Sequence, residues 1–252
     1  MPSYTFYPDP NVESTSVDGL VARSGIDEVM GTIRAGAGVE SYDDTGSNYF
    51  SLLQASATSN QFKFLSRGIY LFDTSTLSDS DSILSATFSL YFTAFFDGLL
   101  GGASANSAKV LVASTPASNT ALVNGDYSQL GAVDFGRTDI QDNLSTGAYT
   151  DITINATGRA DISKTGVTKY GIRVGFDLDN TITGLTWSAN QYHGGSAGYA
   201  DNAGTTQDPK LVVTYASAGP ANLKTYNTNA TANVKTINTN AIANVKTLDT
   251  NV

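Results

Sequence analysis

Short apolar runs separated by turn-forming stretches fill most of this chain, and this spacing constrains its fold more than any other feature. The runs at 64–72 and 83–93 are rich in β-branched and aromatic residues, and in the second one polar Thr87 and Ser89 flank apolar Phe88. This alternation is typical of a half-buried strand. Further strand-like runs lie at 109–113, 132–135, 149–154, 169–178, 184–188 and 210–215. Turn residues such as Gly, Asn and Asp separate them, so we predict an all-β sandwich or barrel, with short helices only near 26–32 and 158–163.

The composition predicts a polar surface with few charges. Only 15% of the 252 residues are charged, against about 25% in typical proteins, and the net charge is −9. A negative field repels phosphate groups, so we expect no nucleic-acid partner. No run approaches about 18 apolar residues, so we expect no membrane insertion. The absence of cysteine excludes disulfides and thiolate metal sites.

The first residues, MPSYTFYPDP, contain neither a basic segment nor an apolar one, so we expect no Sec signal peptide. Uncharged polar surfaces are frequent on extracellular and virion proteins. A virion protein is released by lysis and needs no export signal, so we expect a location on a virion or an extracellular surface. Tyr4 and Phe6 show partial alternation, and this segment can pair with its own sheet or with that of a neighbour.

The C-terminal part has a different pattern. We predict a sandwich domain at 1–215, a linker at 216–221 and a repetitive tail at 222–252, in which Asn222, Asn233 and Asn244 begin copies eleven residues apart. The apolar spacing suits a right-handed coiled coil, whereas the abundant Asn, Thr and Val favour extended or β structure. The sequence is compatible with an extended, a helical or a disordered tail. Short copies bury little alone, so we expect the tail to oligomerise or anchor through its apolar positions Leu223, Tyr226, Val234, Ile237, Val245 and Leu248.

Three segments of the predicted sandwich resemble the DNRLRE family. They are RGIYLFDTS at 67–75, ILSATFSLY at 83–91 and DPKLVVTY at 208–215. The resemblance covers about 16–215 and implies a jelly-roll-like antiparallel β-sandwich, akin to carbohydrate-binding modules, that serves cell-surface, secreted or phage-associated proteins in a non-catalytic role. The chain departs from the family in lacking a signal peptide and in carrying the tail, which resembles repeats at the ends of phage structural proteins.

A glycine-rich segment at 188–207 is predicted to be a long surface loop. Loops of this length inside a domain are often functional. This one carries Tyr192, His193 and Tyr199, and it follows Trp187, the single tryptophan. Aromatic rings stack on the apolar faces of sugars, so these residues form a candidate glycan site. Trp187 can equally be a core residue.

Two groups of oxygen-bearing side chains are candidates for a structural calcium site, the one cofactor that the sequence indicates. Carboxylate and amide oxygens are typical ligands of Ca²⁺. Both groups lie in turn-like stretches, where Asp and Asn also serve the backbone. The first group is Asp177, Asp179 and Asn180, and the second is Asp201, Asn202 and Asp208.

No catalytic set is predicted. His193 is the one histidine, and we interpret it as a solvated loop residue rather than as a member of a Ser-His-Asp set. The glycine-rich stretch at 31–38 lacks the lysine of a phosphate-binding loop, so we interpret it as an ordinary loop or bulge.

These observations lead to one functional hypothesis with two alternatives. The first is a non-enzymatic virion or surface structural protein, of the phage head-decoration, head-fibre or tail-fibre type, which displays its sandwich through the tail. Its partners are copies of itself or other virion or surface proteins. The alternative is an extracellular carbohydrate-binding or adhesive module, and a polysaccharide-cleaving enzyme comes third.

Overall fold

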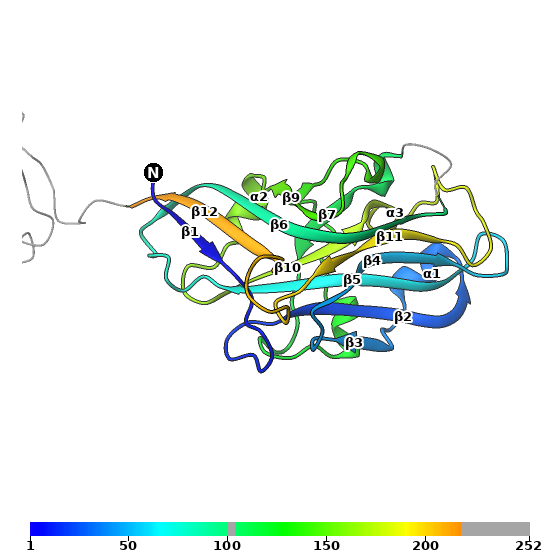
Figure 1. Ribbon diagram of the computed structural model, residues 1–252, viewed down its shortest axis with the longest axis horizontal. Coiled ribbons are helices and arrows are strands. Elements are labelled where there is room, and N and C mark those ends of the chain that lie inside the picture. Colours follow the sequence, from blue (N-terminus) through cyan, green and yellow to red (C-terminus); the bar gives the residue numbers. More distant parts are fainter. Residues whose placement is uncertain (100–103, 218–252) are drawn as a thin grey trace, which may run out of the picture. The chain divides into compact units, whose positions relative to one another are not determined.

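The computed structural model describes residues 1–99 and 104–217. Within them the chain is mostly antiparallel β-sheet, and the sheet curls into a half-barrel (Figure 1). The prediction of an all-β, jelly-roll-like sandwich is confirmed. The tail and most of the linker, including the six apolar assembly positions, lie outside the described residues.

The strands are β1 (Ser3–Phe6), β2 (Asp18–Glu28), β3 (Glu40–Tyr42), β4 (Ser47–Ala55), β5 (Phe62–Asp73), β6 (Ser82–Asp97), β7 (Lys109–Ala113), β8 (Gly136–Arg137), β9 (Ala148–Thr153), β10 (Val167–Val174), β11 (Tyr192–Gly198) and β12 (Lys210–Ala216). The α-helices are α1 (Met30–Ala35), α2 (Ala156–Ala160) and α3 (Gly175–Leu178). Three 3₁₀ turns are η1 (Ala105–Ser107), η2 (Asn124–Ser128) and η3 (Gln141–Asn143). The two predicted helical regions thus contain short helices, shifted by a few residues.

The main path through the sheet follows the order β1-β12-β6-β11-β4-β5-β10-β7-β8. Strand β2 pairs with β5 and carries β3, while β9 pairs with β6. All of these pairings are antiparallel. Long-range pairing of this kind brings together strands that lie far apart in the sequence.

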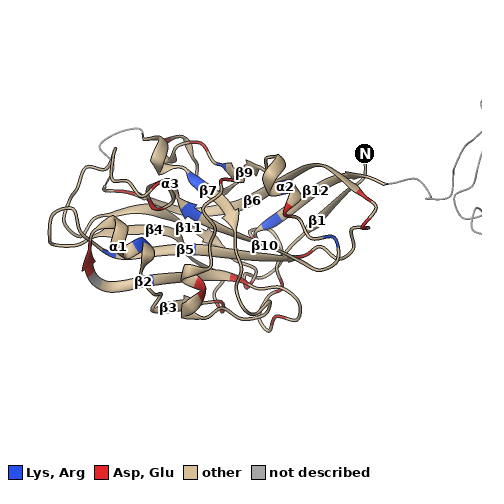
Figure 2. Cartoon of the chain, turned by 180° about the vertical axis from the view of Figure 1, so that it is seen from behind, with Lys and Arg blue, Asp and Glu red and all other residues tan. Residues whose placement is uncertain are grey.

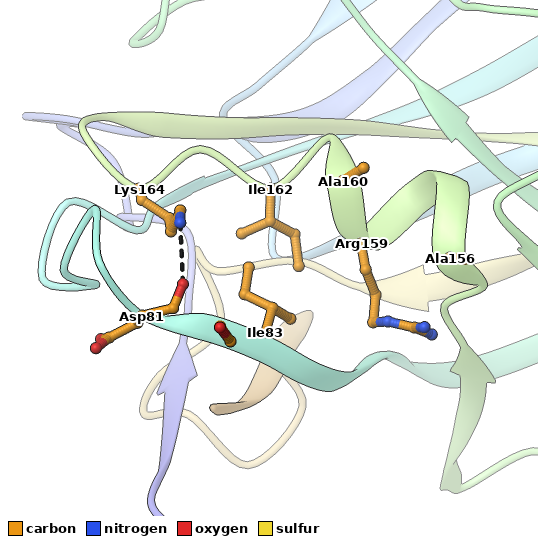
Figure 3. Close-up of a pocket in the computed structure, with 8 residues that line it drawn as sticks. Asp81, Ile83, Ala156, Arg159, Ala160, Ile162 and Lys164 are labelled. Atoms are coloured by element: carbon orange, nitrogen blue, oxygen red, sulfur yellow. Dashed lines mark hydrogen bonds between the residues drawn. The ribbon is translucent and has the colours of Figure 1, made fainter. Parts of the chain in front are cut away.

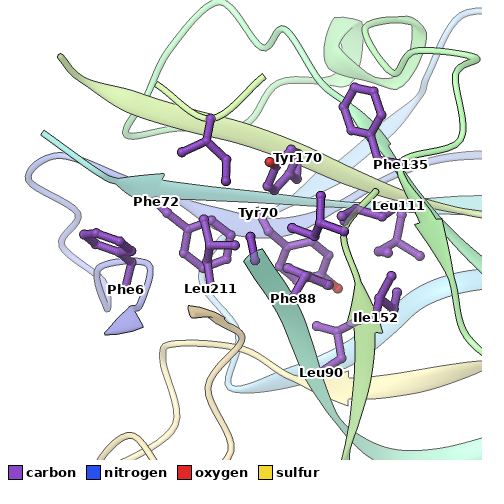
Figure 4. Packing of buried hydrophobic residues seen from close by; sticks show 14 of the residues in the cluster. Phe6, Tyr70, Phe72, Phe88, Leu90, Leu111, Phe135, Ile152, Tyr170 and Leu211 are labelled. Carbon is purple, nitrogen blue, oxygen red and sulfur yellow. The ribbon is translucent and has the colours of Figure 1, made fainter. Parts of the chain in front are cut away.

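Two apolar cores lie on opposite faces of β5. Alternate residues of a strand point to opposite faces, and Tyr70 and Phe72 belong to one core while Ile69 and Leu71 belong to the other. The first core also contains Phe88 of β6, whose ring contacts Tyr70 (Figure 4). The second core is completed by residues of α1, η2 and α3. Because both of its faces are buried, β5 reads as a nearly continuous apolar run in the sequence.

The N-terminal strand closes the sheet of its own chain. In β1, residues 3–6 pair with residues 214–211 of β12, and Tyr4 stacks on Tyr215 at 5.2 Å between ring centroids. Of the two pairings that the sequence left open, the structure contains the one within the chain.

Strand β6 connects the two ends of the sandwich. At its start, Ser82 pairs with Ala216, the last residue of β12. At its far end, Phe96 pairs with Gly194 of β11. At about 3.2 Å per residue, these two ends lie roughly 45 Å apart. We call the end at Ser82 the base and the end at Phe96 the tip.

Some local predictions are wrong. Residues 132–135 and 184–188 form no named strand, and the run at 169–178 divides into β10 and α3. Residues 31–35 of the expected glycine-rich loop belong to α1. The predicted loop at 188–207 contains β11, which lies between β4 and β6 in the sheet.

Candidate ligand-binding face

The structure divides the four residues of the predicted glycan loop. Tyr192 is 37% exposed, whereas His193 and Tyr199 are fully buried. His193 packs edge-on against Phe176, and Tyr199 stacks on Tyr70. The prediction that these two side chains project into solvent is therefore wrong, because β11 lies between β4 and β6 and residues 193–200 are all buried. Trp187 is half-buried against the second core, with its Nε1 3.5 Å from the Gln61 carbonyl oxygen.

Glycine in β11 serves close packing. Gly194 has a φ of +138°, and a Cβ atom there would lie 2.0 Å from the Ser51 carbonyl oxygen of β4. Only glycine fits such a position, because it lacks a side chain and tolerates positive φ. The glycines therefore bring strands together, and they do not indicate a mobile loop.

Four aromatic side chains at the tip form a continuous surface, which we call the aromatic strip: Tyr49, Phe64, Phe96 and Tyr192. The ring centroids are 6.4 Å apart for Tyr49 and Phe64, 5.7 Å for Tyr49 and Phe96, and 6.0 Å for Phe96 and Tyr192. Tyr49 is 38% exposed, and the two phenylalanines are half-buried. The strip thus presents aromatic faces and edges to solvent.

The strand registers explain why these rings meet. Gln54 of β4 pairs with both Tyr192 and Phe64, so these three side chains share one face of the sheet. Phe96 pairs with Gly194, which lies on the same face as Tyr192. Because Gly194 has no side chain, the ring of Phe96 can approach across β11 toward β4.

Polar groups border the aromatic strip. Gln54 lies between two of its rings by register, and its Nε2 is 3.4 Å from the Asn190 carbonyl oxygen. Lys63 Nζ donates a hydrogen bond of 2.8 Å to Asn190 Oδ1. Exposed Asp97 ends β6 beside Phe96. Apolar ring faces with nearby amide, ammonium and carboxylate groups suit a ligand that has both C–H faces and hydroxyl groups.

Asp177 is not a free calcium ligand, which corrects the first predicted calcium group. Its carboxylate accepts two hydrogen bonds from Arg67, at 2.7 and 2.8 Å, and two from Arg173, both at 2.7 Å. Burial alone would raise the pKa of Asp177, but the charge of Arg67 and the hydrogen bonds from both arginines hold it at about 2. The carboxylate is the centre of a buried ion-pair network with a structural role.

The other predicted calcium residues lie in different places. Asp179 is at the surface, 3.5 Å from Arg137, and Asn180 adopts a left-handed conformation with a φ of 50°. Asp201 accepts a hydrogen bond of 2.6 Å from the backbone N–H of Asn11. Asp208 is buried near the connection between β11 and β12. Among the described residues, no three acidic or histidine side chains are already gathered around one metal position.

A buried polar cluster beside His193 of β11 was not predicted from the sequence. Lys109 is fully buried, and its Nζ donates to Gln141 Oε1 at 2.8 Å and to the Ser107 carbonyl oxygen at 3.1 Å. Burial lowers the pKa of Lys109 to about 7. Burial, and then the charge of Lys109, also place the pKa of His193 well below its ordinary value. Within residues 1–99 and 104–217, neither ring nitrogen of His193 is bonded to a carboxylate or to a serine hydroxyl.

A pocket of about 440 Å³ lies at the base, beside the start of β6 (Figure 3). Lys164 Nζ donates to the carbonyl oxygens of Asp79 and Asp81, and Arg159 donates to that of Ile154. The pocket is lined by Asp81, Ser82, Ile83, Ala156, Arg159, Ala160, Ile162 and Lys164. Its two cations hold backbone carbonyls, so we assign it a structural role.

Basic residues are dispersed over separate elements of the described chain (Figure 2), and no helix in that part is long and apolar enough to cross a membrane. No family model matches the chain, and no curated protein matches it. The resemblance to DNRLRE domains therefore stays a prediction, and the function is argued from the arrangement of the residues.

Proposed function

We propose that the protein is a non-enzymatic structural protein of a virion or another extracellular surface, of the head-decoration, head-fibre or tail-fibre type. The observation that supports this most is the position of the two ends of β6. The last strand ends at the base, where the chain continues toward the repeat, and the aromatic strip lies at the tip. A module anchored through the repeat would present the strip away from its point of attachment.

In this proposal the C-terminal repeat oligomerises or anchors the protein. Its apolar positions would pack against copies of the same chain or against a larger assembly, because three short copies bury too little apolar surface by themselves. Within the sandwich, β12 is paired on both sides by β1 and β6, so the repeat is not required to complete this part of the sheet.

Deleting the repeat is expected to abolish self-association while leaving the sandwich folded. We expect the full chain to be a trimer or larger, and a chain ending at Ala218 to be a monomer, because the truncation removes the apolar repeat positions and keeps every described strand. Light scattering coupled to size exclusion measures both masses, and circular dichroism checks the fold. Two monomers would show that the repeat does not drive self-assembly.

A second function is favoured by the aromatic strip: the sandwich is a carbohydrate-binding or adhesive module. Sugars present apolar C–H faces that stack on aromatic rings, and their hydroxyl groups accept and donate hydrogen bonds. The strip and the polar residues around it offer both kinds of contact in one place. The two functions are compatible, because a displayed module can also bind a surface glycan.

Replacing Tyr192 or Tyr49 by Ala is expected to weaken glycan binding about tenfold each, because each change removes one exposed ring of the strip. A glycan array identifies the ligand, and isothermal titration measures the dissociation constants. Tyr42→Ala is the matched control, since Tyr42 is exposed on β3, which pairs with β2 and contributes no ring to the strip. Lack of binding across the array, or equal losses for Tyr42→Ala and Tyr192→Ala, would argue against this function.

A further inference from the structure

Two buried carboxylates lie close to the connection between β11 and β12. Asp18 is 3% exposed and Asp208 is 4% exposed. Both oxygens of Asp18 share one donor, the backbone N–H of Ala200, at 3.1 and 3.3 Å. Asp208 Oδ1 has no hydrogen-bond partner among the described residues. Neither carboxylate takes part in an ion pair with the described lysines and arginines.

An arrangement of this kind is unstable unless something compensates the charge. Buried carboxylates are normally paired, protonated or bound to a metal ion. Burial, followed by repulsion from Asp201, Asp208 and Glu13, places the pKa of Asp18 well above its ordinary value. Burial and repulsion from Asp201 raise the pKa of Asp208 to about 6. Burial and repulsion from Asp201 thus disfavour the charged form of both carboxylates.

A further oxygen atom near Asp18 also has no partner. The hydroxyl of Ser16, two residues before Asp18, is buried and unbonded within the described chain. Buried hydroxyl groups are normally hydrogen-bonded, to protein or to ordered water. Unpartnered oxygens around two unpaired carboxylates are what a hard cation and its water ligands would satisfy.

The N-terminal loop is held over this place. Asp9 Oδ2 accepts hydrogen bonds from the backbone N–H groups of Ser14 and Thr15, and Asp201 accepts one from Asn11. The loop thereby brings Glu13 within electrostatic reach of Asp201. The start of β2 and the N-terminal loop are thus both hydrogen-bonded to the β11–β12 connection, at Ala200 and Asp201.

We infer that Asp18 and Asp208, with Asp201 beside them, hold a calcium ion that fastens the N-terminal loop to the β11–β12 connection. Because three acidic side chains are not already gathered around one point, the remaining ligands would be backbone carbonyls, hydroxyl groups and water. Calcium accepts six to eight oxygen ligands in flexible geometry, whereas magnesium requires a nearly ideal octahedron. The first predicted calcium group plays no part, because Asp177 is held by arginines.

The test compares thermal unfolding of the full chain in calcium chloride and in EDTA at pH 7.5. At a calcium concentration about a hundredfold above its dissociation constant, the Tm of the wild type is expected to rise by about 5–10 °C. Asp18→Asn and Asp208→Asn should each lose this response. In EDTA each variant should melt at or above the wild-type temperature, because the substitution removes charge repulsion, and this result also shows that the variants fold.

Asp179→Asn is the matched control and should keep the calcium response, since Asp179 lies at the surface beside Arg137. Titration calorimetry of the wild type should give one high-affinity calcium per chain, with a weaker response to magnesium. A wild-type Tm that is the same in calcium and EDTA would overturn the inference. A calcium response that survives in both Asp18→Asn and Asp208→Asn would also overturn it, because the ion would then bind elsewhere.

Discussion

Replacing Asp177 by Asn is expected to lower the free energy of unfolding by about 3–5 kcal/mol, because it leaves the buried guanidinium groups of Arg67 and Arg173 without a counter-charge. Asn keeps the size of the side chain but loses the charge and one strong acceptor. The two arginines also bond backbone carbonyls of Tyr127, Arg34 and Gly131. The network therefore links β5 and β10 to α1 and η2, and its loss should loosen this side of the sandwich.

Urea denaturation followed by tryptophan fluorescence measures this change. Asp179→Asn, two residues along the chain, removes a surface pair with Arg137 and should cost less than about 1 kcal/mol. A similar small loss for Asp177→Asn would mean that the network contributes little. Since the pKa of Asp177 is depressed to about 2, its contribution is present above the unfolded pKa and declines as the pH falls toward 2. The difference between the variant and the wild type should hence be constant between pH 5 and 8.

Replacing Lys109 by Met is expected to stabilise the protein by about 2 kcal/mol at pH 7 and to destabilise it by about 1–2 kcal/mol near pH 10.5. Burial lowers the pKa of Lys109 from 10.5 to about 7, which at 1.36 kcal/mol per unit corresponds to about 5 kcal/mol of lost stability at low pH and about 4 kcal/mol at pH 7, where half of the folded chains already have a neutral Lys109. Met removes this cost. It also leaves Gln141 Oε1 and the Ser107 carbonyl oxygen without their donor, which costs about 2 kcal/mol.

The direction of the pH dependence follows from proton binding. Between pH 7 and 10.5 the unfolded chain binds the Lys109 proton more strongly than the folded one, so wild-type stability rises with pH over this interval. His193 is the one titratable neighbour whose shift is tied to Lys109, and its lowered pKa keeps it neutral throughout. Urea midpoints at pH 7, 8.5 and 10 measure the slope, and Lys63→Met controls for the loss of one surface charge. A parallel pH dependence in wild type and Lys109→Met would contradict the prediction.

The architecture could be predicted because the core strands have apolar or alternating residue patterns that are visible in the sequence. β5, β6, β7 and β12 are apolar or alternate along the chain, and all four were expected from their residues alone. β11 was missed because its sequence YHGGSAG has almost no side chains to show a period. Its Gly194 is required by the approach of β4, which lies more than a hundred residues earlier in the chain.

The site was predictable only in part, for the same physical reason. Tyr192 was found, but its companions Tyr49, Phe64 and Phe96 come from three other strands whose registers no local pattern encodes. The FDLDN segment at 176–180 was interpreted as a calcium-binding turn, because the sequence does not show which side chains pack against it. Arg67 is 110 residues away in the sequence and decides the role of Asp177.

The pairing of β12 between β1 and β6 has a mechanical consequence. If the repeat anchors the protein, any drag on the tip is transmitted to the anchor along β12, which runs toward the base. Its hydrogen bonds to both neighbours stand perpendicular to this pull, and those to β6 extend from Lys210 to Ala216. Such bonds are loaded in shear and must yield together, whereas a hairpin pulled at its open end parts one bond at a time. The pairing of β12 therefore resists a pull directed along this strand.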